Sequence, residues 1–270
     1  MITIAPIIKN YTPVNLETEL IVFNNKLLEI GFIRGWTATQ ATKIRITDYF
    51  TGELLAEKPW AGGMGCAIIK AGVIHIFGNT NWATSNNKII HSTLAADFTP
   101  SAPIDALLPN TSMKFYNTAI TADSNGYRMV VETTVGIYFA KSTDLNTWTY
   151  YGGQLAPTEY SGCPSIDYIA GAHYITYLKH IGSSYVTQVA KSTDDCFTFT
   201  YFTGNAKYPS GSYLLAQELE RDGINSSDVS MKEFNGKVYG CYLNGDQNTW
   251  ADYKKFSYNG TLTQLYAEFF

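Results

Sequence analysis

The segment Ala140-Lys-Ser-Thr-Asp-Leu-Asn-Thr-Trp148 has a near copy at Ala190-Lys-Ser-Thr-Asp-Asp-Cys-Phe-Thr-Phe199. Their serines, Ser142 and Ser192, are fifty residues apart. A segment that recurs at such a period is typical of an array of similar supersecondary units. The sequence therefore predicts a repeating fold.

Turn dipeptides between apolar runs extend this repeat to the whole chain. Asn-Gly and similar pairs favour tight hairpins, because a type I′ turn needs a positive φ at both central residues. The predicted hairpin turns are Asn24-Asn25, Ala71-Gly72, Asn125-Gly126, Ala170-Gly171 and Asn235-Gly236. A second β-rich run follows each turn, and a third and fourth strand are expected after it.

Five units of four strands predict an all-β fold, a five-bladed β-propeller of four-stranded antiparallel blades. We expect one domain over residues 1–270, in which a β segment at 2–10 closes the ring. The predicted blades span approximately 14–56, 61–100, 113–152, 160–203 and 226–270. A helix-like interval lies at 212–221, before the last blade. A two-sheet sandwich is the alternative, since it also uses many short strands.

Composition excludes several functional classes. The net charge is −4 and no basic cluster occurs, which argues against binding to nucleic acid. No unbroken apolar run approaches eighteen residues, so no membrane span is expected. The N-terminus lacks the basic and apolar regions of a signal peptide, and we expect none. The four cysteines form no C-x-x-C pair, which predicts free thiols in a reducing compartment, without a disulfide framework, metal site or cofactor.

The recurring turn resembles the Asp-box of sialidases and other propeller glycoside hydrolases, with the pattern Ser-x-Asp-x-Gly-x-Thr-Trp. Residues 142–148 match it except that Asn146 replaces the glycine, and residues 192–199 match more loosely. Such a turn is a structural element, in which an Asp accepts backbone hydrogen bonds above a packed aromatic ring. In its five units and compact size, the chain resembles the five-bladed arabinanase and fructosidase-like glycosidases more than the six-bladed sialidases.

Acids at the start of the first strand of a blade are the catalytic candidates that this resemblance implies. Counting back eight residues from each turn gives Glu17, Met64, Thr118, Cys163 and Asp228. Glu17 and Asp228 fall on blades that neighbour each other across the ring closure. Glu132 ends the second strand of the third blade, which places it at the same rim. If the protein is an enzyme, these three carboxyl groups are its predicted catalytic residues.

One motif argues against catalysis. The fructosidase-like families carry Glu-Cys-Pro, whose Glu is the acid/base, whereas this chain has Gly162-Cys163-Pro164. The resemblance therefore implies that this chemistry is lost. Sialidase chemistry is also not expected, because it needs three arginines at the site.

Aromatic and amide residues in the loops at the predicted functional rim favour ligand binding. Trp and Tyr rings stack on sugars while amides bind hydroxyl groups, although the same residues are enriched in protein interfaces. The predicted ligand-binding residues are Trp36, Trp60, Trp82, Trp250, Asn79, Asn81, Asn244, Gln247 and Tyr160.

These observations predict a non-catalytic propeller that binds a glycan, a cell-surface polysaccharide or a receptor. By analogy with phage receptor-binding modules, we expect a bacteriophage virion or tail component, made in the host bacterial cytoplasm, with other virion proteins as further partners. The alternatives are a glycoside hydrolase of the five-bladed type and a structural adaptor in a large assembly. Fold alone does not decide among them.

Overall fold

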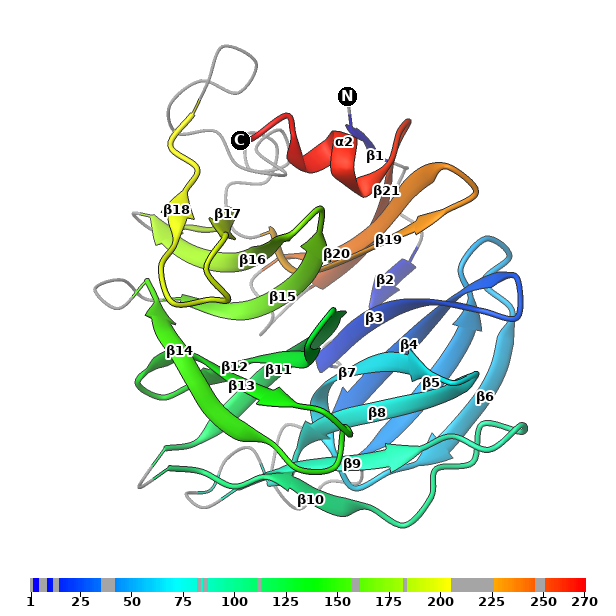
Figure 1. The fold of residues 1–270 in the computed structure, drawn as a ribbon. Coiled ribbons are helices and arrows are strands. Elements are labelled where there is room, and N and C mark those ends of the chain that lie inside the picture. The colour runs from blue at the N-terminus through cyan, green and yellow to red at the C-terminus, as the bar shows by residue number, and fades with distance from the viewer. Residues whose placement is uncertain are drawn as a thin grey trace.

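The computed structural model describes residues 2–4, 9–11, 15–34, 42–81, 84, 87–110, 113–156, 161–181, 184–204, 226–245 and 251–270. These residues form five antiparallel sheets arranged around a central axis (Figure 1). The structure confirms the prediction of an all-β, five-bladed propeller of four-stranded blades.

Four of the sheets are built from consecutive strands. The first sheet holds β3 (Asn15–Phe23), β4 (Lys26–Arg34), β5 (Lys43–Asp48) and β6 (Leu54–Pro59). The second holds β7 (Gly63–Lys70), β8 (Val73–Asn79), β9 (Ile89–Thr93) and β10 (Ile104–Leu107). The third holds β11 (Phe115–Asp123), β12 (Gly126–Thr133), β13 (Gly136–Ser142) and β14 (Thr149–Leu155). The fourth holds β15 (Ser161–Ile169), β16 (Ala172–Ile181), β17 (Ser184–Ser192) and β18 (Thr200–Tyr201).

The fifth sheet joins the two ends of the chain. It contains β19 (Ser226–Phe234), β20 (Lys237–Gly245) and β21 (Ala251–Tyr258), and β21 pairs with β1 (Ile2–Ile4) and β2 (Lys9–Tyr11). Its outer strands therefore come from the N-terminal segment, whereas a fourth strand following β21 in sequence was expected. The inner strands β3, β7, β11, β15 and β19 contact one another in this order, and β19 contacts β3 again. This closure protects the sheet edges.

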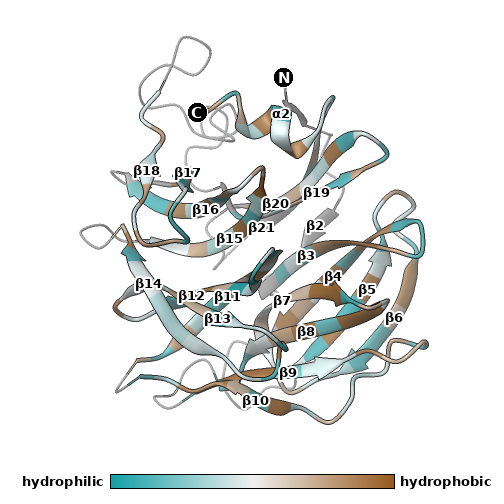
Figure 2. Cartoon of the chain, in the orientation of Figure 1, coloured by the Kyte–Doolittle hydropathy of each residue, from teal (hydrophilic) through white to brown (hydrophobic). Residues whose placement is uncertain are grey.

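Hydrophobic side chains fill the spaces between neighbouring sheets. One cluster joins the third and fourth sheets through Val130, Phe139, Ile175 and Tyr177, and comparable clusters lie between the other pairs of sheets. Side chains of a strand alternate between its two faces, so a strand with apolar residues on both faces packs against both neighbouring blades. Figure 2 shows apolar residues along β4 and β8, the second strands of the first two sheets.

The two recurring turns connect the third and fourth strands of their sheets. Oδ1 of Asp144 accepts hydrogen bonds from the backbone N–H groups of Asn146 (2.8 Å) and Thr147 (2.9 Å). Trp148 is buried and its indole N–H donates to the carbonyl of Leu145. In antiparallel sheets this end of the blade is opposite to the end where the first strand begins. The turns therefore build blades and lie away from the candidate site.

One short helix, α2 (Leu262–Tyr266), packs beside the fifth sheet (Figure 1). It begins with a capping box, in which Thr261 and Gln264 satisfy each other's backbone N–H groups. The hydroxyl of Tyr266 donates to Asp167 of β15. The helix-like interval predicted at 212–221 lies outside the described residues. No helix among the described residues has the length and hydrophobicity needed to cross a membrane.

Candidate active site

Four of the five inner strands are bulged where they begin. The pairing register shifts between Gly63 and Cys66, between Phe115 and Thr118, between Gly162 and Ser165, and between Ser227 and Ser230. In three of them the first residue inside the bulge has a positive φ: 48° at Met64, 44° at Cys163 and 55° at Asp228. A bulge re-aims a side chain, and backbone strain of this kind in non-glycine residues is frequent at functional sites. The bulged strand starts lie at the axial end of the propeller, where a functional site is therefore expected.

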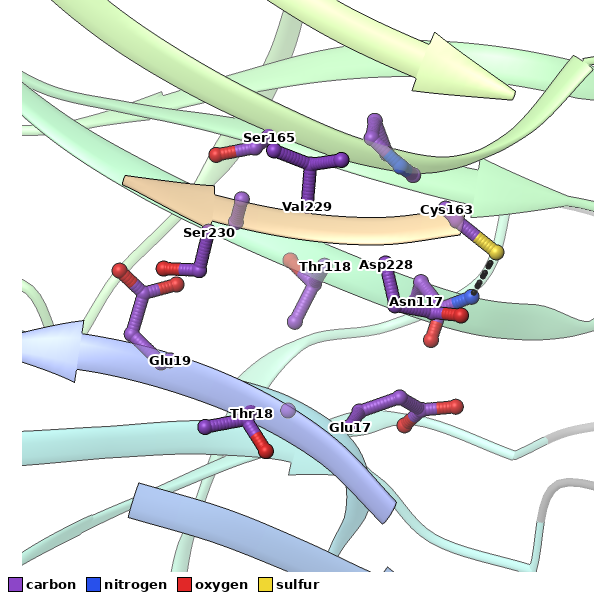
Figure 3. Close-up of a pocket in the computed structure, with 13 residues that line it drawn as sticks. Glu17, Thr18, Glu19, Asn117, Thr118, Cys163, Ser165, Asp228, Val229 and Ser230 are labelled. Carbon is purple, nitrogen blue, oxygen red and sulfur yellow. Dashed lines mark hydrogen bonds between the residues drawn. The ribbon is translucent and has the colours of Figure 1, made fainter. Parts of the chain in front are cut away.

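Two of the predicted acids meet there. Glu17 of β3 and Asp228 of β19 line one cavity, together with Asn117 of β11 and Cys163 of β15. Figure 3 shows these four side chains at the same end of their strands, whereas Glu19 lies farther along the axis. The cavity has a volume of about 30 Å³, which is room for one water molecule.

Glu132, the third predicted acid, joins this group from the second strand of the third sheet. Its Oε2 accepts hydrogen bonds from the side-chain amide of Asn117 (2.9 Å) and from the backbone N–H of Cys163 (2.8 Å). Burial raises the pKa of Glu132 to about 7, with a smaller contribution from the negative charge of Asp228, and hydrogen bonds from the Cys163 backbone and from the side chain and backbone of Asn117 oppose the rise. A carboxyl group with this pKa is protonated in about half of the molecules at neutral pH. Glu17, Asn117, Glu132, Cys163 and Asp228 are called the axial site below.

Asn117 was missed because the third hairpin turn lies one residue earlier than predicted. The turn is formed by Ser124 and Asn125, and Gly126 already belongs to β12. Counting back from this turn gives Asn117 in place of Thr118. Thr118 is buried and its hydroxyl donates to the carbonyl of Val130. The position at the start of this strand is therefore filled by Asn117, which donates a hydrogen bond to Glu132, and not by Thr118.

Gly162 explains how a carboxyl group is present although Glu-Cys-Pro is not. A Cβ atom added to Gly162 would lie 2.9 Å from Oε1 and 3.1 Å from Cδ of Glu132. The carboxyl group of Glu132 therefore occupies the space next to position 162 that a side chain there would need. Position 162 lacks the glutamate, but a carboxyl group still lies next to it, because Glu132 on another strand reaches this place.

Replacing Gly162 by alanine is expected to raise the pKa of Glu132 above its value in the wild type. The added methyl group forces the Glu132 carboxyl to move, which weakens the N–H hydrogen bonds that favour its charged form. A ¹³C NMR titration of the Glu132 side-chain carbon measures the effect. Thr143→Ala, at an exposed turn on the opposite rim, is the control. Equal titrations of Glu132 in Gly162→Ala and wild type would contradict this placement of Glu132.

The thiol of Cys163 is a hydrogen-bonding group of the axial site and not a nucleophile. Burial raises its pKa well above the usual value, and the negative charges of Asp228, Glu132 and Glu17 raise it further. The protonated thiol donates to Asp228, and its sulfur accepts from Nδ2 of Asn117 at 3.3 Å. A thiol activated for attack has a lowered pKa instead.

An ion pair lies deeper along the axis, beyond the acids. Nζ of Lys232 is 3.1 Å from Oε1 of Glu19, whose side chain is buried. Burial raises the pKa of Glu19, while Lys232 acts to lower it. The neighbouring strands are tied by the backbone N–H of Leu20, which donates to Ser230 (3.0 Å). These contacts join β3 and β19, the two strands that carry Glu17 and Asp228.

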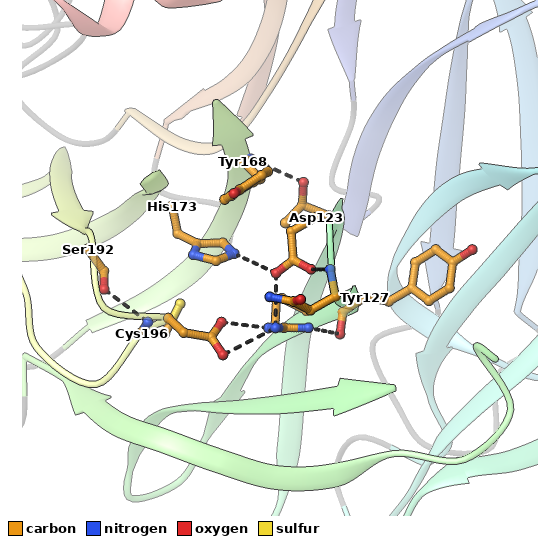
Figure 4. A network of polar contacts seen from close by, with 10 residues as sticks. Asp123, Tyr127, Tyr168, His173, Ser192 and Cys196 are labelled. Atoms are coloured by element: carbon orange, nitrogen blue, oxygen red, sulfur yellow. Dashed lines mark hydrogen bonds and ion pairs between the residues drawn. The ribbon is translucent and has the colours of Figure 1, made fainter. Parts of the chain in front are cut away.

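A second polar cluster lies between the third and fourth sheets, at their opposite end (Figure 4). Ligand atoms of Asp123, His173 and Asp195 lie within 4.8 Å of one another, a spacing that suits a metal ion. Arg128, however, pairs with Asp123 (3.0 Å) and with Asp195 (2.7 Å), so a cation already balances both carboxylates. The cluster is an ion-pair network that joins two blades, and we assign no metal to it.

The predicted ligand-binding residues lie in different surroundings. Trp60 is only 5% exposed, and its indole N–H donates to Ser92 inside the protein. Asn79 is buried and donates to the carbonyls of Phe115 and Tyr116. Both side chains thus serve the contacts between blades. Asn81 is exposed after β8, and Asn244 belongs to β20. Trp36, Trp82, Trp250, Gln247 and Tyr160 lie outside the described residues.

Several solved structures with the same fold are glycoside hydrolases by name. A glycoside hydrolase matches with a TM-score of 0.69 and 12% identity over 94% of this chain and 90% of its own. An α-L-arabinofuranosidase (CtGH43) from Clostridium thermocellum has a TM-score of 0.62 and 15% identity over 85% and 82%. The GH43_1 enzyme from Xanthomonas citri complexed with xylotriose has a TM-score of 0.61 and 13% identity over 93% and 88%. At these identities the likeness shows the fold alone.

No protein-family model matches the sequence, and no curated protein does. The solved structures nevertheless show that the chain is a five-bladed propeller that resembles GH43 glycoside hydrolase propellers. This resemblance contradicts our prediction of a non-catalytic glycan- or receptor-binding module and favours the glycoside hydrolase alternative. Nothing in these matches supports a phage tail, a virion or other virion proteins as partners.

Proposed function

We propose that the protein is a glycoside hydrolase that uses the axial site to cleave glycosidic bonds of pentose-containing polysaccharides. The observation that carries the proposal is the carboxyl group of Glu132, with a pKa of about 7, in the same site as the carboxyl groups of Asp228 and Glu17. Glycoside hydrolysis needs one protonated and one ionised carboxyl group on either side of the scissile bond.

Glu132 is the general acid in this proposal. Because its pKa is raised, it retains its proton at the pH where an ordinary glutamate has lost it, and it can donate this proton to the departing glycosidic oxygen. Asp228 lies close enough for its charge to contribute to this raised pKa. Its role is therefore electrostatic: it favours the protonated form of Glu132 and the positive charge that develops on the sugar in the transition state.

Glu17 is the partner of Glu132 across the axis. Glu17 comes from the first sheet and Asp228 from the fifth, and neither of these sheets neighbours the third sheet, which carries Glu132. Because Asp228 has the electrostatic role, Glu17 is assigned to the side of the substrate opposite to Glu132. The Glu17 carboxylate would take a proton from a water molecule, whose oxygen then attacks the anomeric carbon as the bond to the leaving oxygen breaks.

The pentose class is suggested by the names of the similar structures, which include an arabinofuranosidase, an exo-1,5-α-L-arabinanase and an enzyme complexed with xylotriose. The test is a panel of linear arabinan, xylan, xylotriose and the p-nitrophenyl glycosides of α-L-arabinofuranose and β-D-xylopyranose. We expect the wild type to release sugar from at least one of them, well above a Glu17→Gln/Glu132→Gln double variant. Equal release by the two proteins on every substrate would contradict the proposal.

A further inference from the structure

The two oxygen atoms of the Glu132 carboxyl group have different surroundings. Oε2 accepts two N–H hydrogen bonds, from the Asn117 amide at 2.9 Å and from the Cys163 backbone at 2.8 Å. Both of these hydrogen bonds go to Oε2, and the backbone N–H of Asn117 is a further donor to the carboxyl group. Oε1 lies over Gly162, where the absence of a side chain leaves it room.

This asymmetry decides where the proton of the acid resides. An oxygen that already accepts two N–H groups is the poorer place for a proton, because an O–H there would face two donors and give up the acceptor capacity that they use. The proton of neutral Glu132 is therefore on Oε1. An acid that must hand its proton to a substrate needs such a fixed direction.

Asn117 is well suited to maintain this direction. Its Nδ2 donates both to Oε2 of Glu132 and to the sulfur of Cys163 at 3.3 Å, and the thiol of Cys163 donates to Asp228. A continuous set of hydrogen bonds thus connects Glu132 with Asp228 through one amide and one thiol. Asn117 itself sits in the irregular pairing between Phe115 and Thr118, which turns its side chain toward the axis.

We propose that Asn117 is a positioning residue of the axial site, which holds Oε2 of Glu132 so that the acid proton is presented on Oε1. The proposal rests on the proposed function for its catalytic meaning, but the hold of Asn117 on Glu132 is measurable without any substrate. The polar contact is lost in Asn117→Leu, which has nearly the same shape. In Asn117→Asp the donor is replaced by a second acid.

The first measurement is a titration of the Glu132 side-chain carbon by ¹³C NMR, assigned with Glu132→Gln. The hydrogen bond from Asn117 favours the charged form, so its loss is expected to raise the pKa of Glu132 by about one unit in Asn117→Leu. Asn117→Asp is expected to raise it at least as much, because a second negative charge is placed beside the first. Gln154→Leu removes an amide that donates to the carbonyl of Val135 on the same sheet, and it should leave the titration unchanged.

The second measurement is steady-state kinetics on the best substrate of the wild type. Asn117→Leu is expected to lower kcat about tenfold to a hundredfold while KM changes little, and to move the alkaline limb of the pH profile upward with the NMR pKa. Should Asn117→Leu fail to fold, Asn117→Asp gives the same two readouts. An unshifted Glu132 titration in a folded Asn117 variant overturns the inference. If the Asn117 variants shift the Glu132 titration but the wild type hydrolyses none of the substrates, the contact between Asn117 and Glu132 is supported and the proposed function is rejected.

Discussion

Glu132→Gln is expected to lower kcat on a natural polysaccharide by about 10² to 10⁴-fold, the usual contribution of a general acid. Glutamine keeps the shape of the side chain and an oxygen that can accept from Asn117 and Cys163, but it has no acidic proton. The loss should shrink on a dinitrophenyl glycoside, because so good a leaving group departs without protonation. A general structural defect would instead lower the rates on both substrates equally.

The measurement is kcat on xylan or arabinan and on the matching aryl glycoside, with thermal unfolding as the check of folding. Glu53→Gln, at an exposed position between β5 and β6, is the matched control and should retain full activity. A Glu132→Gln protein that keeps the wild-type kcat on the polysaccharide would exclude Glu132 as the acid.

Lys232→Ala is expected to destabilise the protein by about 3 kcal/mol at pH 7, because it leaves Glu19 buried without its cation. Burial by itself would lower the pKa of Lys232, but the charges of Glu19 and Asp167 more than offset this and raise it, so the lysine is charged in the native protein. The pKa of Glu19 is raised already in the wild type by burial, and removal of Lys232 raises it more.

Protonation of Glu19 removes the unpaired charge, so the loss of stability in Lys232→Ala should be smaller at pH 5 than at pH 7. Urea unfolding at both pH values measures it. Lys237→Ala, at an exposed position on the neighbouring strand β20, should change the free energy of unfolding by less than about 0.5 kcal/mol. An equal loss for the two variants at pH 7 would show that the Glu19 and Lys232 pair contributes nothing to stability.

The fold was predictable because its signals are local and repeated. Tight turns and alternating strands occur in each unit, so an error in one unit does not alter the architecture. The error in the fold lies in the fifth unit. Its outer strand β1 is the N-terminal segment that was predicted to close the ring, but the helix at Leu262–Tyr266 occupies residues that were expected to form a strand.

The site was partly predictable for the same reason. Glu17 and Asp228 follow from counting back along strands of equal length, and Glu132 follows from the antiparallel course of its hairpin. Asn117 does not, because the third turn begins one residue early and the count then points to Thr118. Trp60 shows another limit: a tryptophan in a connection has the same sequence signal whether it faces a ligand or, as here, fills the space between two sheets.

The incorrect functional prediction arose from reading a motif position as a position in space. Gly162 stands where a related motif has its glutamate, and sequence alone indicates a lost acid. In the folded protein the missing side chain leaves room for Glu132, which reaches the same place from the neighbouring sheet. A site of this kind is defined by where its carboxyl groups meet and not by the strand that carries each of them.

The pH dependence of kcat/KM of the wild-type protein on its best arabinan or xylan substrate tests the central claim most directly. The acid must be protonated to act, so the rate is expected to be high below the pKa of Glu132 and to fall tenfold per pH unit above about 7. A rate that stays constant from pH 6 to pH 9, or hydrolysis that is absent at every pH, would contradict the assignment of Glu132 as the acid of a glycoside hydrolase.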